Sequence, residues 1–249
     1  MSKNSTKARR NKTSTIIPQE QRPTEREQFG TFIQRVIRQL EISQNSPVRF
    51  ADIADCDKRR QSDLFNILDA LEVFGHISDK LIVWRGFGAT TAAFVRYGVQ
   101  NELRAHTESI VEIFMVGQSP SLSTLVVKFI SLFIFLGVDS LNIREVVNLF
   151  ADSPEHAKKV LRRLYLVVFV LEQSGVIEHG YAYSNYIIKQ PLDVIVSAIF
   201  QEVPRLRMFP EESVEALLNR LDDVYIKNLH RRRRELYLQA ISRFDVIQE

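Results

Sequence analysis

Cysteine is almost absent from this chain of 249 residues, which contains only Cys56. A single cysteine excludes a disulfide within the chain and cannot by itself anchor a cysteine-based zinc site. The sequence also lacks an apolar run of the roughly 18 residues that a membrane span needs. The closest stretch, from Leu125 to Leu136, is interrupted by Lys128 and Ser131. These absences indicate a protein of a reducing compartment, the cytosol or the nucleus.

Sequence motifs of enzymes are equally scarce. There is no glycine-rich phosphate loop, no Gly-x-Ser-x-Gly and no carboxylate dyad. The histidines are scattered, and no two of them have the four-residue spacing of a helical metal site. They are His76, His106, His156, His179 and His230. We therefore expect a binding protein rather than an enzyme, with no cofactor and no metal.

Positive charge is concentrated at the N-terminus. Residues 1–27 carry seven lysines and arginines against three glutamates, whereas the whole chain has a net charge of +3. This polar segment has no apolar core that would make it a secretory signal, and we expect it to be disordered. It is either a nuclear-import address or phosphate-binding arm, or a solvated tail with no partner. A second basic run, Arg231 to Arg234, is expected to be a solvated helix surface.

The first half of the chain has the element order of a DNA-binding module. Apolar residues at helical spacing from Phe29 to Leu40 predict an amphipathic helix. A short strand and a short helix follow over 48–54, and a longer helix runs from about Arg59 to Phe74. We expect this helix to stop at Gly75 in the left-handed conformation. A β-hairpin around 78–80 completes a winged helix, whose third helix enters the major groove of DNA.

The second half repeats this plan. A strongly apolar helix over 122–133 follows a Ser-Pro-Ser start signal. A short strand and a short helix lie over 141–150, and a long helix then runs to about Ser174 and stops at Gly175. Residues 176–189 have strand character and supply a second hairpin. The two halves therefore predict two copies of one unit.

A direct alignment supports this repeat. The halves align without a gap at an offset of 100 residues, and both contain Leu-Glu followed by Gly-x-Ile, which an accidental match between two core helices explains less easily. The matched residues are Leu64, Phe65, Ile67, Leu71, Glu72, Gly75 and Ile77, which fall on Leu164, Tyr165, Val167, Leu171, Glu172, Gly175 and Ile177.

We therefore predict a mostly α fold with small β-wings, built from two winged-helix (helix-turn-helix) domains in tandem. Residues 1–27 form the basic tail, 28–88 the first domain, 89–118 a helical linker, 119–190 the second domain and 191–249 a C-terminal helical segment. The C-terminal segment has apolar residues at helical spacing. It can serve as a partner-binding or dimerising helix, but we expect it to fold back onto the second domain.

The third helix of the second copy carries a family resemblance. Arg162-Arg163-Leu164-Tyr165, Val170-Leu171-Glu172 and Gly175-Val176-Ile177 match in spacing a signature that reads RRxYD, then NVLE, then GLI. That signature belongs to the recognition helix of the E-two-F/DP cell-cycle transcription factor family, which this helix resembles. Residues 121–133 resemble the first helix of that family, and Val83-Trp84-Arg85-Gly86 in the first copy resembles the tryptophan that ends its wing.

Two tandem copies are similar to the atypical branch of this family. The resemblance implies that the two domains pack together in place of the usual heterodimer, so that no separate partner chain is required. A DP-like partner or self-association stays open. The signature aspartate and asparagine are replaced by Leu166 and Phe169. These apolar residues either extend the core of the second domain or lie at the interface between the two domains, and we favour the interface. At the same offset, the first copy has Phe65 for the tyrosine and Ser62-Asp63 for the arginine pair, which marks it as degenerate.

Arginine pairs suit the reading of guanine. A guanidinium donates two hydrogen bonds to O6 and N7 of guanine, a pair of acceptors that no other base offers in the major groove. Arg162 and Arg163 are therefore the leading base-contact candidates. Lys158 and Lys159 would supply attraction to phosphate that is independent of sequence, and Tyr165 is either a phosphate contact or a core residue. In the first copy Lys58, Arg59 and Arg60, about one turn before the matched position, can present charge on a similar face.

The sequence thus predicts a nuclear regulator of transcription. We expect it to bind double-stranded DNA at a GC-containing promoter element of RNA polymerase II genes, with cell-cycle-type control. The alternative is a winged-helix scaffold for protein interactions in a transcription or replication complex, without sequence-specific DNA binding. The near-neutral charge of the folded part favours the scaffold, whereas the Arg162-Arg163 pair and the basic tail favour DNA.

Overall fold

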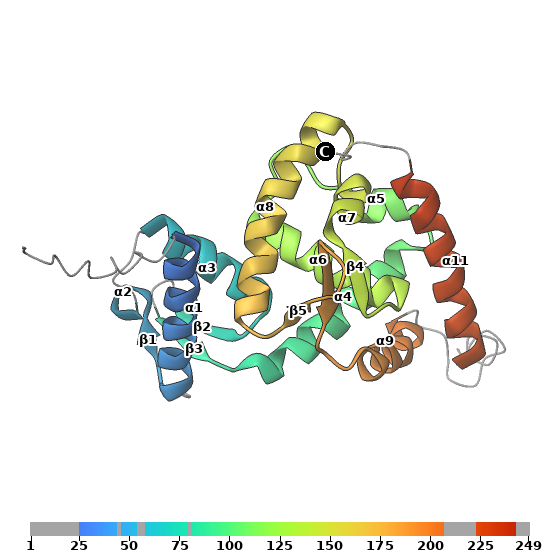
Figure 1. The fold of residues 1–249 in the computed structure, drawn as a ribbon. Coiled ribbons are helices and arrows are strands. Elements are labelled where there is room, and N and C mark those ends of the chain that lie inside the picture. The colour runs from blue at the N-terminus through green and yellow to red at the C-terminus, as the bar shows by residue number, and fades with distance from the viewer. Residues whose placement is uncertain (1–24, 44–45, 54–57, 79–80, 207–222, 243–249) are drawn as a thin grey trace, which may run out of the picture.

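The computed structural model describes residues 25–43, 46–53, 58–78, 81–206 and 223–242. Within these ranges the chain is mostly helical, with two small antiparallel sheets (Figure 1). This confirms the predicted mostly α fold with small β-hairpins. Cys56 and most of the predicted basic tail lie outside the described residues, although the first helix already begins at Glu25.

The first unit contains two long helices, one short helix and a three-stranded sheet. Its elements are α1 (Glu25–Ile42), β1 (Val48–Arg49), α2 (Phe50–Ile53), α3 (Lys58–Ala70), β2 (Phe74–Ser78) and β3 (Leu81–Trp84). The strands are antiparallel and lie in the order β1-β3-β2. The predicted helix up to Phe74 is therefore too long at its C-terminal end, because Phe74 already belongs to a strand.

The second unit has the same element order. It comprises α6 (Leu122–Leu136), β4 (Ser140–Asn142), α7 (Ile143–Phe150), α8 (Pro154–Gln173), β5 (Ile177–His179) and β6 (Asn185–Ile188), with strand order β4-β6-β5. Local sequence fixes the helix starts. The Ser121 hydroxyl accepts a hydrogen bond from the Thr124 amide at 3.0 Å, and Ser153 caps α8 ahead of Pro154. Both are the short polar residues that helix N-termini prefer.

The remaining helices surround the second unit. The 3₁₀ turn η1 (Phe87–Ala89), α4 (Thr90–Arg104) and α5 (Ile110–Phe114) join the two units, and α9 (Leu192–Leu206) and α11 (Asp223–Ile241) follow them. Helix α4 packs against α6 and α9, whereas α11 packs against α5, α6 and α7. The predicted return of the C-terminal segment onto the second copy is thus confirmed for α11; residues 207–222 lie outside the described ranges.

The two units pack directly on each other. Helix α8 lies between α1 and α3 of the first unit and α6 and α7 of its own unit (Figure 1). Helix α3 in turn contacts α6. The first helix of each unit therefore packs on the third helix of the other, which is the reciprocal pattern of a two-fold interface. The buried side chains of both units form one continuous apolar cluster.

Candidate nucleic-acid interface

The helix ends show how the two third helices correspond. The left-handed residue after α8 is Gly175, with φ 72°, but the left-handed residue after α3 is Glu72, with φ 56°. The same backbone hydrogen bonds close both ends: the Glu72 amide donates to Asp69 O at 2.8 Å, and the Gly175 amide donates to Glu172 O at 3.0 Å. The prediction that Gly75 stops the helix is therefore wrong, because Gly75 lies inside β2.

The sheets give the same correspondence. His76 pairs with Ile82, which pairs with Val48 on the other side, and these three match His179, Tyr186 and Leu141. The Val73 carbonyl accepts from the Arg85 amide, as the Val176 carbonyl accepts from the Lys189 amide. Equivalent residues from the third helix to the first hairpin strand thus differ by 103 in number, so the gapless alignment at an offset of 100 is wrong by nearly one helical turn.

Side-chain burial agrees with the corrected correspondence. Leu64, Phe65, Ile67 and Leu68 of α3 are all buried, and so are their counterparts Val167, Val168, Val170 and Leu171 in α8. The uncorrected alignment would instead match buried Phe65 with Tyr165, which is 37% exposed.

The correction changes which residues of the first unit match the arginine pair. Arg59 and Arg60 are the structural counterparts of Arg162 and Arg163, and the assignment of Ser62-Asp63 to that place is wrong. All four arginines are exposed. Arg59 and Arg60 lie at the start of α3, whereas Arg162 and Arg163 lie near the middle of α8. The first unit therefore keeps both arginines, contrary to the expectation that it is degenerate there.

The second arginine of each pair is held against its own unit. The Arg60 guanidinium lies 5.2 Å from the centre of the Phe29 ring, near the start of α1. Arg163 Nη1 donates to the Pro120 carbonyl, just before α6. Arg162 has no hydrogen-bond or ion-pair partner among the described residues, and is the freer member of its pair. The geometry therefore favours Arg162 over Arg163 as a group available to a ligand.

The other predicted site residues are also on the surface. Lys158 and Lys159 are exposed one turn before the Arg162 pair, and Lys58 is exposed at the start of α3. Tyr165 is partly exposed, so the core alternative for this side chain is not supported. Its counterpart in α3 is Ser62, which is exposed too.

The interface between the units has an aromatic side, where α1 meets α8 and Gln34 also donates to Gln173 at 3.1 Å, and a polar side, where α3 meets α6. On the aromatic side the rings of Phe29 and Phe169 stack with centroids 5.9 Å apart. On the polar side the Ser123 hydroxyl donates to the Asn66 carbonyl at 2.9 Å. Phe169 and Asn66 are counterparts in the corrected register. The interface position predicted for Phe169 is confirmed, while Leu166 is partly buried against the common core.

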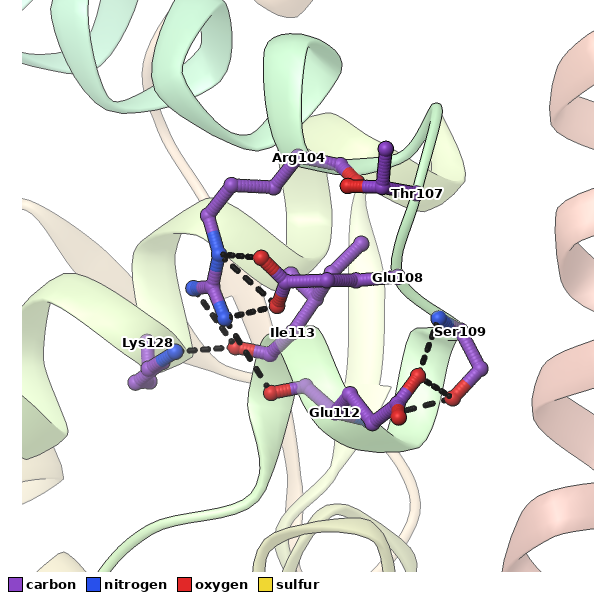
Figure 2. A network of polar contacts seen from close by, with 7 residues as sticks. All are labelled: Arg104, Thr107, Glu108, Ser109, Glu112, Ile113 and Lys128. Carbon is purple, nitrogen blue, oxygen red and sulfur yellow. Dashed lines mark hydrogen bonds and ion pairs between the residues drawn. The ribbon is translucent and has the colours of Figure 1, made fainter.

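A polar network fixes the link between α4 and α6 (Figure 2). Arg104 Nε donates to both carboxylate oxygens of Glu108 at 3.0 Å, and its other nitrogens reach the carbonyls of Glu112 and Ile113 at the end of α5. Lys128 of α6 donates to the same Ile113 carbonyl. Burial and the nearby Arg104 charge lower the pKa of Lys128 to about 8.

The basic run on α11 is partly buried, which contradicts the expectation of a solvated surface. Arg233 is 6% exposed and forms a bidentate pair with Glu102 of α4, with both N–O distances at 2.7 Å. Its guanidinium also lies 3.8 Å from the Phe135 ring centre, and Arg234 donates to the Leu136 carbonyl at 3.0 Å. Both arginines thus bind the C-terminal end of α6, where cations are favoured.

Two histidines in the second half of the chain are buried. Buried His156 bonds Asp152 and the Gly117 carbonyl, each at 3.0 Å. A pocket of about 740 Å³ lies between the α6–β4 turn, α9 and α11, and His230 lines it. Burial, Arg233 and Arg234 lower the pKa of His230 to about 4, so this imidazole is neutral near pH 7.

Within the described ranges, no group of three or more His, Cys, Asp or Glu side chains is placed to hold a metal ion. None of the helices described is long and apolar enough to cross a membrane.

Comparison with protein-family models, with curated proteins and with solved structures finds no match to this chain. Because these comparisons find no match, the choice of a candidate site rests on the geometry of the chain itself. The exposed arginines of α3 and α8 are the best candidate.

Proposed function

We propose that the chain is a transcription regulator that binds double-stranded DNA through two winged helices acting as one pseudo-symmetric body. The observation that carries this proposal is the corrected register. It puts an exposed arginine pair at the same place on the third helix of each unit, which is the helix that a winged helix presents to the major groove.

The register also extends the family resemblance to the first unit. Arg59-Arg60-x-x-Asp63 matches the RRxYD signature with Ser62 in place of the tyrosine. Asn66-Ile67-Leu68-Asp69 resembles NVLE, and Trp84 ends the hairpin. The aspartate and asparagine that the second unit lacks are thus present in the first. Together the two units carry the elements of an E-two-F/DP-like pair within one chain.

The arrangement suits a target with two G·C-containing half-sites. A two-fold relation between the units places the two third helices in equivalent positions on a duplex whose halves are related by the same symmetry. Arg59 and Arg162 would each donate two hydrogen bonds to O6 and N7 of a guanine. Lys58, Lys158 and Lys159 would add contacts to phosphate that set affinity rather than sequence.

The interface between the units makes a separate DP-like partner unnecessary. The faces of α1 and α6 that would receive the third helix of a second chain are occupied by α8 and α3 of this chain. The protein would therefore act on DNA as a single chain, and the nucleus would be its place of action. No enzymatic activity is part of this proposal.

Fluorescence anisotropy with the full chain tests the proposal. A duplex with a symmetric GC core is compared with an AT duplex of equal length, each at 50 and 200 mM salt. We expect binding to the GC duplex at least about 1,000-fold tighter than to the AT duplex, as for specific protein–DNA complexes. Changing both Arg59 and Arg162 to alanine should remove this preference while leaving the melting temperature unchanged.

Two outcomes would contradict the proposal. Binding that is equal on both duplexes and lost at higher salt would indicate attraction to phosphate alone. No binding at either salt concentration would favour the protein-interaction scaffold. In that case the exposed arginines would have to recognise acidic groups of another protein.

A further inference from the structure

The arginine pairs differ in the hydroxyl that follows them. Ser62 comes three residues after Arg59 in α3, whereas Tyr165 occupies the equivalent position in α8. Ser62 is exposed, and its oxygen accepts a long hydrogen bond, 3.4 Å, from the Asn66 side-chain amide. Residues three apart on a helix are neighbours on its surface. The Ser62 hydroxyl therefore lies beside Arg59 on the solvent side of α3.

The start of α3 can open without exposing the core. Each side chain from Lys58 to Asp63 is exposed or partly exposed, and Leu64 is the first one that is fully buried. Opening the first turn of α3 gives up the contact of Arg60 with the Phe29 ring but exposes no fully buried side chain of the helix, so its cost is small. In α8 the same position follows buried His156, Val160 and Leu164, so this helix cannot open locally around Tyr165.

We propose that Ser62 is a phosphorylation site for a protein kinase that selects arginine, and that the modification switches off DNA binding by the first unit. The switch rests on the proposed function, whereas the modification itself does not. Arg59 and Arg60 stand three and two residues before the hydroxyl, where a kinase with carboxylates in its substrate groove would bind them. Local opening of the first turns of α3 presents this segment in extended form.

The transfer needs ATP as the phosphoryl donor. The Ser62 Oγ–P bond forms as the bond between the γ-phosphorus and the bridging oxygen breaks. ADP leaves, and the hydroxyl proton passes to the catalytic base of the kinase. The product carries a charge of about −1.5 to −2 near neutral pH and three strong acceptor oxygens.

The phosphate would change the proposed interface in two ways. It accepts charge-assisted hydrogen bonds from Arg59, which withdraws that guanidinium from a guanine. It also repels the phosphates of DNA, and this repulsion adds to that from the neighbouring Asp63 carboxylate. Because Ser62 lies on the exposed side of α3, the phosphate can remain in solvent. The fold should therefore persist while DNA affinity falls.

Mass spectrometry decides whether the site is used. The full chain is incubated with ATP and, as the probe, the catalytic subunit of cyclic-AMP-dependent protein kinase. We expect one phosphate on Ser62, none there in Ser62→Ala, and at least about tenfold slower modification when Arg59 and Arg60 are both alanine. A folded chain that stays unmodified at Ser62, or a rate indifferent to the arginines, overturns the proposal.

DNA affinity then decides whether the modification is a switch. We expect the phosphorylated chain to bind the GC duplex at least about tenfold more weakly than the untreated chain. Kinase treatment should leave the affinity of Ser62→Ala at its own untreated value. Ser242→Glu, a charge change at an exposed residue just after the end of α11, should leave affinity unchanged.

Equal affinity before and after phosphorylation at Ser62 overturns the switch. Failure of the untreated chain to bind DNA overturns the proposed function and the switch together. The site itself is judged by the mass measurement alone, so the two failures are distinguishable.

Discussion

The two units share a backbone plan but differ in what surrounds them. The second unit is enclosed by α4, α5, α9 and α11, and its first helix, α6, is buried along most of its length. Among the described residues, no comparable set of helices encloses the first unit, although α4 reaches it where the Tyr97 hydroxyl donates to the Ala70 carbonyl at 2.7 Å. Arg35 of the first unit is exposed, whereas Lys128, at the equivalent place in α6, is half-buried and donates to the Ile113 carbonyl of α5. Within the described part of the chain, the second unit is therefore the more enclosed of the two.

The largest effect on stability should come from the cover of the second unit. Arg233→Met leaves the Glu102 carboxylate buried without its partner, and breaking a buried pair in this way costs about 3–5 kcal/mol. Urea denaturation should show this loss in the free energy of unfolding. Arg232→Met, on the exposed side of α11, should change it by less than about 0.5 kcal/mol. Equal effects of the two substitutions would mean that α11 is not clamped by this pair.

The two sides of the interface between the units should contribute unequally. Phe29→Ala removes a buried ring stacked on Phe169 and should destabilise the protein by about 2–4 kcal/mol. Ser123→Ala removes only the hydroxyl bonded to the Asn66 carbonyl and should cost about 0.5–1.5 kcal/mol. Thermal unfolding of both variants measures the ratio. A larger loss for Ser123→Ala would show that the polar side dominates.

Replacing Lys128 should change how the free energy of unfolding depends on pH, whereas replacing Arg35 should not. The pKa of Lys128 is about 8 in the folded chain, below its ordinary value of 10.5, so the unfolded state binds more protons between these values. Stability contributed by this group therefore rises as pH increases from 8 to 10.5.

Relative to Lys128→Met, the wild type should gain about 1–3 kcal/mol across that range, a figure reduced for partial exposure. The matched variant Arg35→Met should leave the pH profile parallel to that of the wild type. A parallel profile for Lys128→Met would show that this ammonium is solvated in the folded chain.

The smallest effect tests the corrected register itself. Gly175 has φ 72°, so Gly175→Ala should cost about 1 kcal/mol because an alanine is strained there. At Gly75 an added Cβ meets only the flexible end of Arg85, at 2.9 Å. Gly75→Ala should therefore change stability by less than about 0.5 kcal/mol, as measured by chemical denaturation. Similar losses at both positions would support the uncorrected alignment.

Most of the fold follows from local patterns, whereas the errors at the end of α3 and at Arg233 have a local and a distant cause, respectively. Helical spacing of apolar residues predicted α1, α6 and α8, and Ser121 and Gly175 marked helix ends as expected. The end of α3 was placed wrongly because Glu72 occupies the left-handed position that glycine usually takes. One such exception shifted the comparison of the two units by three residues.

The burial of Arg233 could not be predicted from its neighbours in the sequence. Its partner Glu102 is 131 residues away and belongs to another helix, so the run from Arg231 to Arg234 had the pattern of an ordinary solvated face. For the candidate site, the arginines and lysines named from the sequence are exposed, whereas the core alternative for Tyr165 is not supported. The equivalence of the two arginine pairs required the strand register and the helix ends.

Single-arginine variants test the central claim most directly. Dissociation constants for a symmetric GC duplex are measured for the wild type, Arg59→Ala and Arg162→Ala at one salt concentration. If the two units read DNA as equivalent halves, each substitution should weaken binding by about 10- to 100-fold, the value of one guanine contact. A loss confined to Arg162→Ala, with Arg59→Ala at the wild-type value, would contradict the account and leave the first unit as a passive support.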